Sequence, residues 1–303
     1  MLSLPLTLFL FLVSAGAAAK NIIVSNDDGW ATAQIRQAVS TLADAGHSVV
    51  LSAPALNQSG KGSSTKTPAT MSKPCEFDSC PTGSPAQGYN ETTPHLNYVN
   101  GYPVDAARYG IQTLAPQFFN GSAPDLVVSG PNVGFNIGLE VFFSGTVGAA
   151  CEGARSGIPA VAFSGTSGAQ VSYTTLESDP TAASSHAAQI YASLTSTFVA
   201  ALTSSPGALL PADTVVNVNY ASIDKCASAD AYKFVFSRLF WNPLATDAKA
   251  CGKDHLPSEG SVIGKGCYAS VSVIDAGSKV DANATIQAVV FGRLQTLPLA
   301  CLD

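Results

Sequence analysis

The sequence is poor in charge and contains no run of basic residues. Only 12% of its 303 residues are charged, and 15 lysines and arginines stand against 21 acidic residues, for a formal net charge of -6. A protein that follows a nucleic-acid backbone needs a basic patch to neutralise the phosphates. The composition therefore argues against DNA or RNA as a partner. A small phosphorylated ligand stays open, because a metal ion can supply the positive charge.

Two common hydrolase signatures are also missing. No Gly-x-Ser-x-Gly stretch is present, which argues against the nucleophile elbow of an α/β-type serine hydrolase. The His-Glu-x-x-His pattern of a zinc hydrolase is absent too. The four histidines are scattered singly, as expected of surface or capping residues: His47, His95, His186 and His255.

Long apolar runs are confined to the N-terminus. Leu2 to Val13 is almost wholly apolar and is followed by small residues that suit a signal peptidase, although no Lys or Arg precedes it. The run is too short to span about 30 Å of hydrocarbon. We therefore predict a signal peptide over residues 1–19, a secreted, extracellular mature protein, and no membrane association after cleavage.

The cysteines and glycosylation sequons agree with export. Cys151 lies among small residues without a nearby histidine and is predicted to be a buried free thiol. The other six could form three bridges in fifteen pairings: Cys75, Cys80, Cys226, Cys251, Cys267 and Cys301. Three sequons predict a glycoprotein, at Asn90, Asn120 and Asn283. A fourth, at Asn57, is expected inside the site and unmodified.

A short apolar strand that ends in two carboxylates organises the chain. Residues 22–24 are β-branched and apolar, as in a strand buried on both faces, and residues 31–45 then show helical spacing. Asp27, Asp28 and Gly29 lie between them, at the carboxyl edge where open α/β sheets bind ligands. Two adjacent carboxylates repel each other unless a cation holds them. We therefore predict a metal site at Asp27 and Asp28.

The remaining pattern predicts an α/β fold with a Rossmann-like, mostly parallel sheet flanked by helices. Further strands are expected at 48–52 and 125–129, and residues 101–105 are expected to open a helix that runs through Leu114. Residues 75–96 are predicted to be a disulfide-pinned insertion with little regular structure. We expect one domain over residues 20–303, with a divergent, less regular C-terminal part over residues 220–303.

A polar, glycine-rich segment at residues 57–64 follows the second strand. Its Gly60-Lys61-Gly62 fails the P-loop pattern, which needs Ser or Thr after the lysine. It also fails the dinucleotide fingerprint, which needs a glycine in place of Thr65. A flexible surface loop is the alternative, but the position at the carboxyl end of a strand favours a loop of the site.

Residues 129–138 and the segment after them are rich in glycine and small polar residues. Three glycines four apart, with Asn132 and Asn136 between them, predict a loop, since glycine destabilises a helix by about 1 kcal/mol. Residues 144–146 (Ser-Gly-Thr) then precede a small-residue helix ending near Gly157. The N–H groups and hydroxyls at that helix start suit a phosphate, with ordinary capping as the alternative. The neighbouring polar loop favours the phosphate pocket.

These motifs together resemble the SurE family of metal-dependent phosphatases, which act on nucleoside monophosphates and other phosphate monoesters. The matching segments occur in the family's order: 25–29 (Ser-Asn-Asp-Asp-Gly), 53–60, 101–105, 129–138, 144–147, 157–162 and 216–219. The resemblance weakens after residue 220. Pro131 replaces the aliphatic residue usual in the family, and the signal and the cysteine insertion are not those of the bacterial members.

The resemblance implies roles for individual residues. Four of them resemble the family's metal ligands: Asp27, Asp28, Ser59 and Asn132. Their hard oxygen atoms suit one divalent cation, Mg²⁺ or Mn²⁺, with Ca²⁺ as the alternative in crystals. Four others resemble the phosphate-binding set: Asn136, Ser144, Gly145 and Thr146.

The implied reaction is hydrolysis of a small phosphate monoester, such as a nucleotide, by attack of a metal-activated water on phosphorus. Asp27 or Asp28 would orient or deprotonate that water. The alternative is a secreted, non-catalytic protein that binds a metal and a phosphorylated ligand. Family members oligomerise through C-terminal elements, and that is the region least alike here, so a homodimer is left open.

Overall fold

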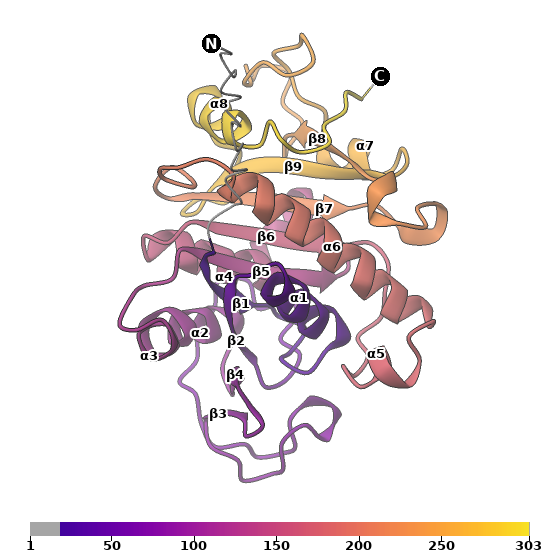
Figure 1. Cartoon of the computed structure of the whole chain (residues 1–303). Coiled ribbons are helices and arrows are strands. Elements are labelled where there is room, and N and C mark those ends of the chain that lie inside the picture. Colours follow the sequence, from indigo (N-terminus) through magenta and orange to yellow (C-terminus); the bar gives the residue numbers. More distant parts are fainter. Residues whose placement is uncertain (1–18, 303) are drawn as a thin grey trace, which may run out of the picture.

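The computed structural model describes residues 19–302 (Figure 1), so the signal-peptide prediction falls outside the described residues apart from Ala19. One sheet holds nine strands in the order β3-β4-β2-β1-β5-β6-β7-β9-β8. Their bounds are β1 Asn21–Ser25, β2 Ser48–Pro54, β3 Gln87–Asn90, β4 Thr93–Val99, β5 Leu126–Val133, β6 Ala160–Gly165, β7 Thr214–Tyr220, β8 Lys233–Ser237 and β9 Tyr268–Asp275. The six central strands, in the spatial order β4-β2-β1-β5-β6-β7, are parallel to one another. Strand β3 at one end and strands β9 and β8 at the other run in the opposite direction. The predicted α/β class is confirmed.

Helices cover both faces of the sheet. Their bounds are α1 Ala33–Asp44, α2 Pro103–Tyr109, α3 Ala115–Phe118, α4 Gly145–Arg155, α5 Thr175–Ser178, α6 Ala183–Thr203, α7 Glu259–Ile263 and α8 Ala284–Arg293. Figure 1 shows α1 and α6 side by side on one face. Within the described part of the chain, no helix is both long enough and apolar enough to cross a bilayer.

The alternation of side chains along β1 divides the core into two halves. Ile22 and Val24 join the cluster under α1, α6 and α8, while Ile23 joins the cluster under α2, α3 and α4. Successive side chains of a strand point to opposite faces, so a strand that is apolar at every position is covered on both. This is why the continuous apolar run at residues 22–24 lies at the centre of the sheet.

The strand order reverses between β1 and β5. The chain passes from β1 outward through β2 to β4, and then returns to the other side of β1 to form β5, β6 and β7. Such a switch point leaves a crevice at the carboxyl ends of the two central strands, where α/β folds bind ligands. Asp27 and Asp28 follow β1, and Asn132 lies near the end of β5, so the predicted ligands meet at this crevice.

Two local expectations differ from the structure. Residues 75–96 contain a bond between Cys75 and Cys80, but β3 and β4 also form there, and β4 extends the parallel sheet beside β2. The glycine-rich segment after residue 129 is not wholly a loop, because β5 runs to Val133, with a register shift around the cis Gly130–Pro131 peptide. Edge pairing and a local register shift leave little periodicity in the sequence.

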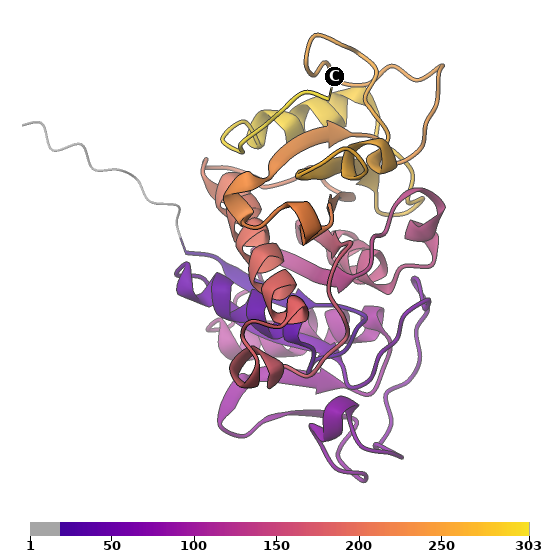
Figure 2. The same cartoon turned by 90° about the vertical axis from the view of Figure 1, so that its right-hand side faces the viewer.

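The C-terminal part, predicted to be less regular, adds β9 and β8 to the same sheet. In Figure 2 its orange and yellow segments occupy one end of the molecule, and the strands β3 and β4 lie toward the other. The six paired cysteines join as Cys75–Cys80, Cys226–Cys267 and Cys251–Cys301. Cys151 is free and buried, as predicted, and burial raises the pKa of its thiol to about 11.

Candidate active site

Two buried carboxylates form the centre of the site. Asp27 is 3% exposed and Asp28 is 0% exposed. The hydroxyl of Thr146 donates to Asp27 Oδ1 at 2.6 Å, and the Gly145 N–H donates to Asp27 Oδ2 at 3.1 Å. The Val133 N–H donates to Asp28 Oδ2 at 2.8 Å. Every one of these donors is electrically neutral.

The turn that presents the carboxylates requires glycine at position 29. Gly29 has φ +110°, and a Cβ atom there would lie 2.0 Å from Oε2 of Glu76. The side chain of Asn26 closes the same turn, since it accepts from the Gly29 N–H at 3.2 Å and donates to the Gly29 carbonyl at 3.1 Å. The positive φ strains any residue with a side chain, and the end of the flexible Glu76 side chain would also have to move.

No basic side chain neutralises the aspartate pair. In the described part of the chain, no ion pair involves Asp27 or Asp28. Burial raises the pKa of Asp27, and burial followed by the charge of Asp27 raises the pKa of Asp28 well above its ordinary value. A third acid, Glu76, lies nearby: its Oε2 has no hydrogen-bond partner, and burial raises its pKa to about 7. The charge of Lys73 opposes the shift of Glu76, but among the described residues no such cation balances the aspartate pair, and this suits a divalent cation.

The segments that carry the other two predicted metal ligands surround the aspartates. Asn132 is 8% exposed, and its amide nitrogen donates to the Gly134 carbonyl at 2.8 Å, which leaves its amide oxygen as a neutral ligand atom. The Gln58 N–H donates to the Asp27 carbonyl at 2.7 Å, so the exposed Ser59 follows a residue fixed to the site.

Among residues 19–302 no three His, Cys, Asp or Glu side chains form a metal-binding group. The candidate centre therefore consists of two carboxylates and neutral oxygens. The chemistry of this donor set fits a hard cation, Mg²⁺ or Mn²⁺, better than zinc. The ligand roles of the four residues stay predictions.

The predicted phosphate-binding residues divide into two groups. At the start of α4, the Ser144 hydroxyl accepts from the Val147 N–H at 3.0 Å and so caps the helix, while Gly145 and Thr146 hold Asp27. Capping, the alternative considered for this turn, is therefore present, and the donors expected for phosphate contact a carboxylate. Asn136 lies elsewhere, with its amide nitrogen donating to the Ser164 hydroxyl at 2.7 Å. Their role toward phosphate stays a prediction.

Sequence reasoning missed Gln170, which contacts the site directly. Its amide nitrogen donates to Asp28 Oδ1, and its amide oxygen accepts from the side chain of Asn57. Gln170 lies in the loop after β6, at the same edge of the sheet as the aspartates. That position was the available signal, because the strand over residues 160–165 is adjacent to β5 and its carboxyl end faces the same crevice.

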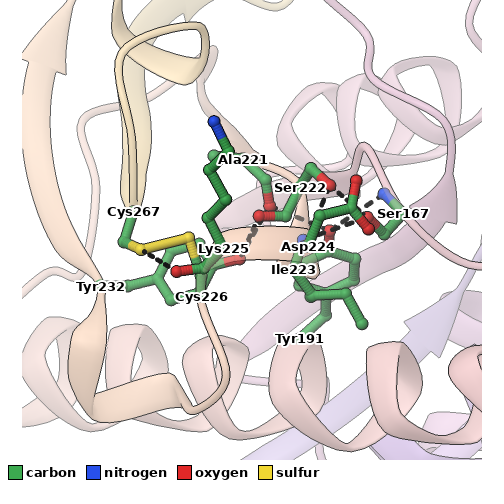
Figure 3. The surroundings of a disulfide bond; sticks show 10 residues. All are labelled: Ser167, Tyr191, Ala221, Ser222, Ile223, Asp224, Lys225, Cys226, Tyr232 and Cys267. Atoms are coloured by element: carbon green, nitrogen blue, oxygen red, sulfur yellow. Dashed lines mark hydrogen bonds between the residues drawn. A yellow bond between two sulfur atoms is a disulfide. The ribbon is translucent and has the colours of Figure 1, made fainter.

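Contacts from the C-terminal half hold the loop that carries Gln170. The Ser167 N–H donates to the Tyr191 hydroxyl at 3.0 Å, and the Ser167 hydroxyl bonds the Ser222 hydroxyl at 2.9 Å. Figure 3 shows these side chains in the surroundings of the Cys226–Cys267 bond, which ties the end of the segment from Ala221 to Cys226 to the start of β9. A disulfide far from the aspartates in sequence thus supports the loop beside them.

A second missed residue, Glu259, lies on α7 and contacts the loop after β5. Its carboxylate accepts from the Asn217 amide at 2.9 Å and from the Gly138 N–H at 3.4 Å. The Asn217 amide also donates to the Asn136 carbonyl at 2.9 Å. Burial raises the pKa of Glu259 to about 8. No sequence signal pointed to this residue, because it follows β7 by about forty residues of weakly patterned chain.

Known proteins match this chain in sequence and in fold. The family described as Survival protein SurE matches residues 22–242. An acid phosphatase of Yarrowia lipolytica is 36% identical over 285 residues, which cover 84% of this chain and 78% of the relative. A 5'-nucleotidase SurE of Lawsonia intracellularis is 30% identical over 204 residues, which cover 67% of this chain and 66% of the relative.

A solved structure agrees with the architecture. The crystal structure of the SurE protein from Aquifex aeolicus aligns with a TM-score of 0.57 at 22% identity, covering 85% of this chain and 94% of that one. At that identity the likeness concerns the fold alone. Since the family match extends over more than half of the chain and includes both aspartates and the loop after β5, this chain belongs to the SurE family.

Proposed function

We propose that this protein is a secreted, metal-dependent phosphomonoesterase that hydrolyses nucleoside monophosphates or similarly small phosphate monoesters. The observation that carries the proposal is the buried Asp27–Asp28 pair, which lies at the sheet's switch point and contacts only neutral donors. Relatives named acid phosphatase and 5'-nucleotidase SurE support a phosphate monoester as the substrate class. Because the chain has a net charge of -6, it does not attract a phosphate by its overall charge, and a bound cation would supply the positive charge.

The metal would be held by Asp27, Asp28 and the amide oxygen of Asn132, with the Ser59 hydroxyl beside them. When bound, a divalent cation supplies positive charge to the phosphoryl oxygens and lowers the pKa of a neighbouring water. The protein's own contribution is to fix the two carboxylates. Thr146 and Gly145 hold both oxygens of Asp27, and this leaves its position well defined before substrate arrives.

Asp28 is held in the same way by two neutral donors, one at the end of β5 and one in the loop after β6. Val133 fixes one oxygen and Gln170 fixes the other, while Asn57 orients Gln170. In hydrolysis one of the two aspartates accepts the proton of the water that attacks phosphorus. The N-terminus of α4, directly beside Asp27, favours the negative charge that develops on the phosphoryl oxygens.

The test is release of inorganic phosphate from purified protein. We expect turnover of adenosine monophosphate and of p-nitrophenyl phosphate with Mn²⁺ or Mg²⁺, and loss of turnover after chelation that the metal restores. Calorimetry run in parallel measures Mn²⁺ binding without substrate. Metal binding with no turnover on any monoester would favour the non-catalytic binding protein instead.

Secretion has its own test. When residues 1–303 are expressed in a eukaryotic host, the protein should accumulate in the medium. N-terminal sequencing of the secreted protein should show that it begins near Lys20. Treatment with a glycosidase should lower its mass if the sequons are used. Retention inside the cell with an intact N-terminus would contradict this part of the proposal.

A further inference from the structure

A cavity of about 570 Å³ lies in the C-terminal part of the chain, away from the aspartate pair. Its walls come from β8, the segment around residues 249–258, α8 and the tail at residues 299–302. Most of this lining follows residue 242, where the family match ends. None of the candidate site residues lines it. Its volume is within the range of small-molecule sites, about 300–1,000 Å³.

One wall of the cavity is aromatic. Phe236 of β8 and Phe291 of α8 stack with their ring centroids 3.8 Å apart and an interplanar angle of 10°. Trp241 also lines the cavity and is 71% exposed, so its indole lies at the edge of the opening. Other apolar residues of the lining include Val235, Leu256 and Leu299. Such a wall suits a planar ring that packs against the indole.

The charged side chains that line the cavity are lysines, although the exposed Asp254, between Lys253 and His255 in sequence, does not line it. Lys249 and Lys253 line it and are both exposed, and His255 lies beside them. Among the described residues that line it, none is acidic, although the chain as a whole carries 21 acidic residues against 15 basic ones. Two cations next to an aromatic wall select a molecule that is both apolar and negatively charged.

The walls are also fixed in place. The Cys251–Cys301 bond, whose two residues line the cavity, ties the tail to the segment that carries the lysines. The Leu256 N–H donates to Asp247 at 2.9 Å, and Asp247 is in turn bound by the buried Arg238. A site that is held open before binding loses less entropy when a ligand enters.

From these observations we propose that the cavity binds a small organic anion with an aromatic body. The ring packs beside Trp241 and over the Phe236–Phe291 wall, and the anionic group faces Lys249 and Lys253. The site is separate from the proposed phosphatase site, because α7 stands between them. Ser258 and Ser261 line the cavity, whereas Glu259 bonds Asn217 on the other side.

The probe is 8-anilinonaphthalene-1-sulfonate, with neutral N-phenyl-1-naphthylamine as its matched uncharged analogue. Calorimetry on the full mature chain should show one sulfonate bound per chain, and weaker binding of the neutral analogue. The double variant Lys249→Gln with Lys253→Gln should weaken sulfonate binding about tenfold, since two ion pairs are lost. Trp241→Ala should also weaken it. All three side chains are exposed, so folding should be retained.

The control is Lys73→Gln with Lys225→Gln, two exposed lysines that line no part of this cavity; it should bind like wild type. Equal losses in both double variants, or equal affinity for the neutral analogue, would overturn the proposal. Displacement of the sulfonate by inorganic phosphate would place it at the aspartates instead. If decanoate bound more tightly than the sulfonate, the aromatic part of the proposal would be wrong and the cavity would be assigned to an acyl ligand. The proposal would also be wrong if the protein formed a dimer that does not bind the probe and that dissociates in Trp241→Ala. The cavity would then be the contact surface for a second copy of the chain.

Discussion

Two groups of carboxylates in this protein, one around Asp247 and one around Asp27 and Asp28, differ in whether a basic side chain balances their charge. In the C-terminal half Arg238, which is 4% exposed, places one nitrogen 2.8 Å from both oxygens of Asp247 and another 3.4 Å from Asp281. Around Asp27 and Asp28, in contrast, all the hydrogen-bond donors are neutral. One group carries its own cation, and the other does not.

This difference separates a structural cluster from a candidate reactive one. A buried carboxylate paired with arginine is satisfied within the fold, so its removal should disturb folding. A buried carboxylate pair without a cation is unfavourable in the isolated chain and becomes favourable only when a positive ion is added. The first group should therefore matter for stability and the second for activity.

The largest effect is expected from Asp28→Asn. The substitution removes one ligand charge and should reduce turnover by more than about a hundredfold under metal saturation. The free energy of unfolding without metal should stay equal or rise, because repulsion from Asp27 is relieved. Kinetics on p-nitrophenyl phosphate and denaturant titration with chelator measure the two quantities.

The matched control is Asp247→Asn in the Arg238 cluster. It should lower stability clearly, because it leaves a buried guanidinium without its main partner, and it should spare turnover of the folded fraction. Wild-type turnover in Asp28→Asn would end the functional assignment of the aspartate pair.

Arg238→Met tests the other side of the comparison. Removing the guanidinium leaves the buried Asp247 and the half-buried Asp281 without a cation, which should cost about 3–5 kcal/mol of unfolding free energy. Turnover per folded molecule should stay near wild type at low temperature. Urea titration followed by circular dichroism gives the first quantity. A stable Arg238→Met protein that lacks activity would show that this cluster serves the site and not the fold.

Gln170→Leu should weaken metal binding without removing a ligand. Gln170 orients Asp28 and is itself held by Asn57, and loss of such an outer hydrogen bond typically costs 10- to 100-fold, about the range we expect for Mn²⁺ affinity. Calorimetric titration of Mn²⁺ measures it. Gln37→Leu on α1, where the glutamine bonds only Thr41, is the control. Equal Mn²⁺ affinity in the two variants would show that Gln170 does not support the centre.

The last expected effect concerns stability and pH, through Glu259. Burial raises the pKa of Glu259 from 4.5 to about 8, although the amide of Asn217 and the hydroxyl of Ser272 oppose the shift. The folded protein thus keeps a proton that the unfolded chain releases between these values. This group's stability contribution is complete below pH 4.5 and is lost as pH rises toward 8, with a slope of at most about 1.4 kcal/mol per pH unit.

Glu259→Gln removes this titration while keeping an acceptor for Asn217. Relative to wild type, the variant should gain stability progressively from pH 5 to pH 8, as measured by denaturant titration at several pH values. Glu177→Gln, on the exposed side of α5, should leave the curve unchanged. A constant difference between wild type and Glu259→Gln across that range would mean that Glu259 is already ionised in the folded protein.

Prediction from sequence worked best where one element carries the signal. Residues 22–24 predict a buried strand, and the two acids after them predict a site at its end. Both signals come from residues that are neighbours in the sequence. It worked less well where a residue's role depends on a partner. The amino-acid pattern placed Thr146 at a helix start, but only the folded chain shows its hydroxyl on Asp27 at 2.6 Å.

The sequence by itself determined the α/β class, the family and the position of Asp27 and Asp28 at the carboxyl edge of the sheet. These follow from periodicity and from short motifs, which need no knowledge of distant segments. The tertiary structure alone decided which cysteines pair, that Gln170 contacts Asp28 across 142 residues, and that Arg238 neutralises Asp247 while nothing positive reaches Asp27. Such contacts depend on how separate elements pack and where their side chains then point, and no local pattern encodes that.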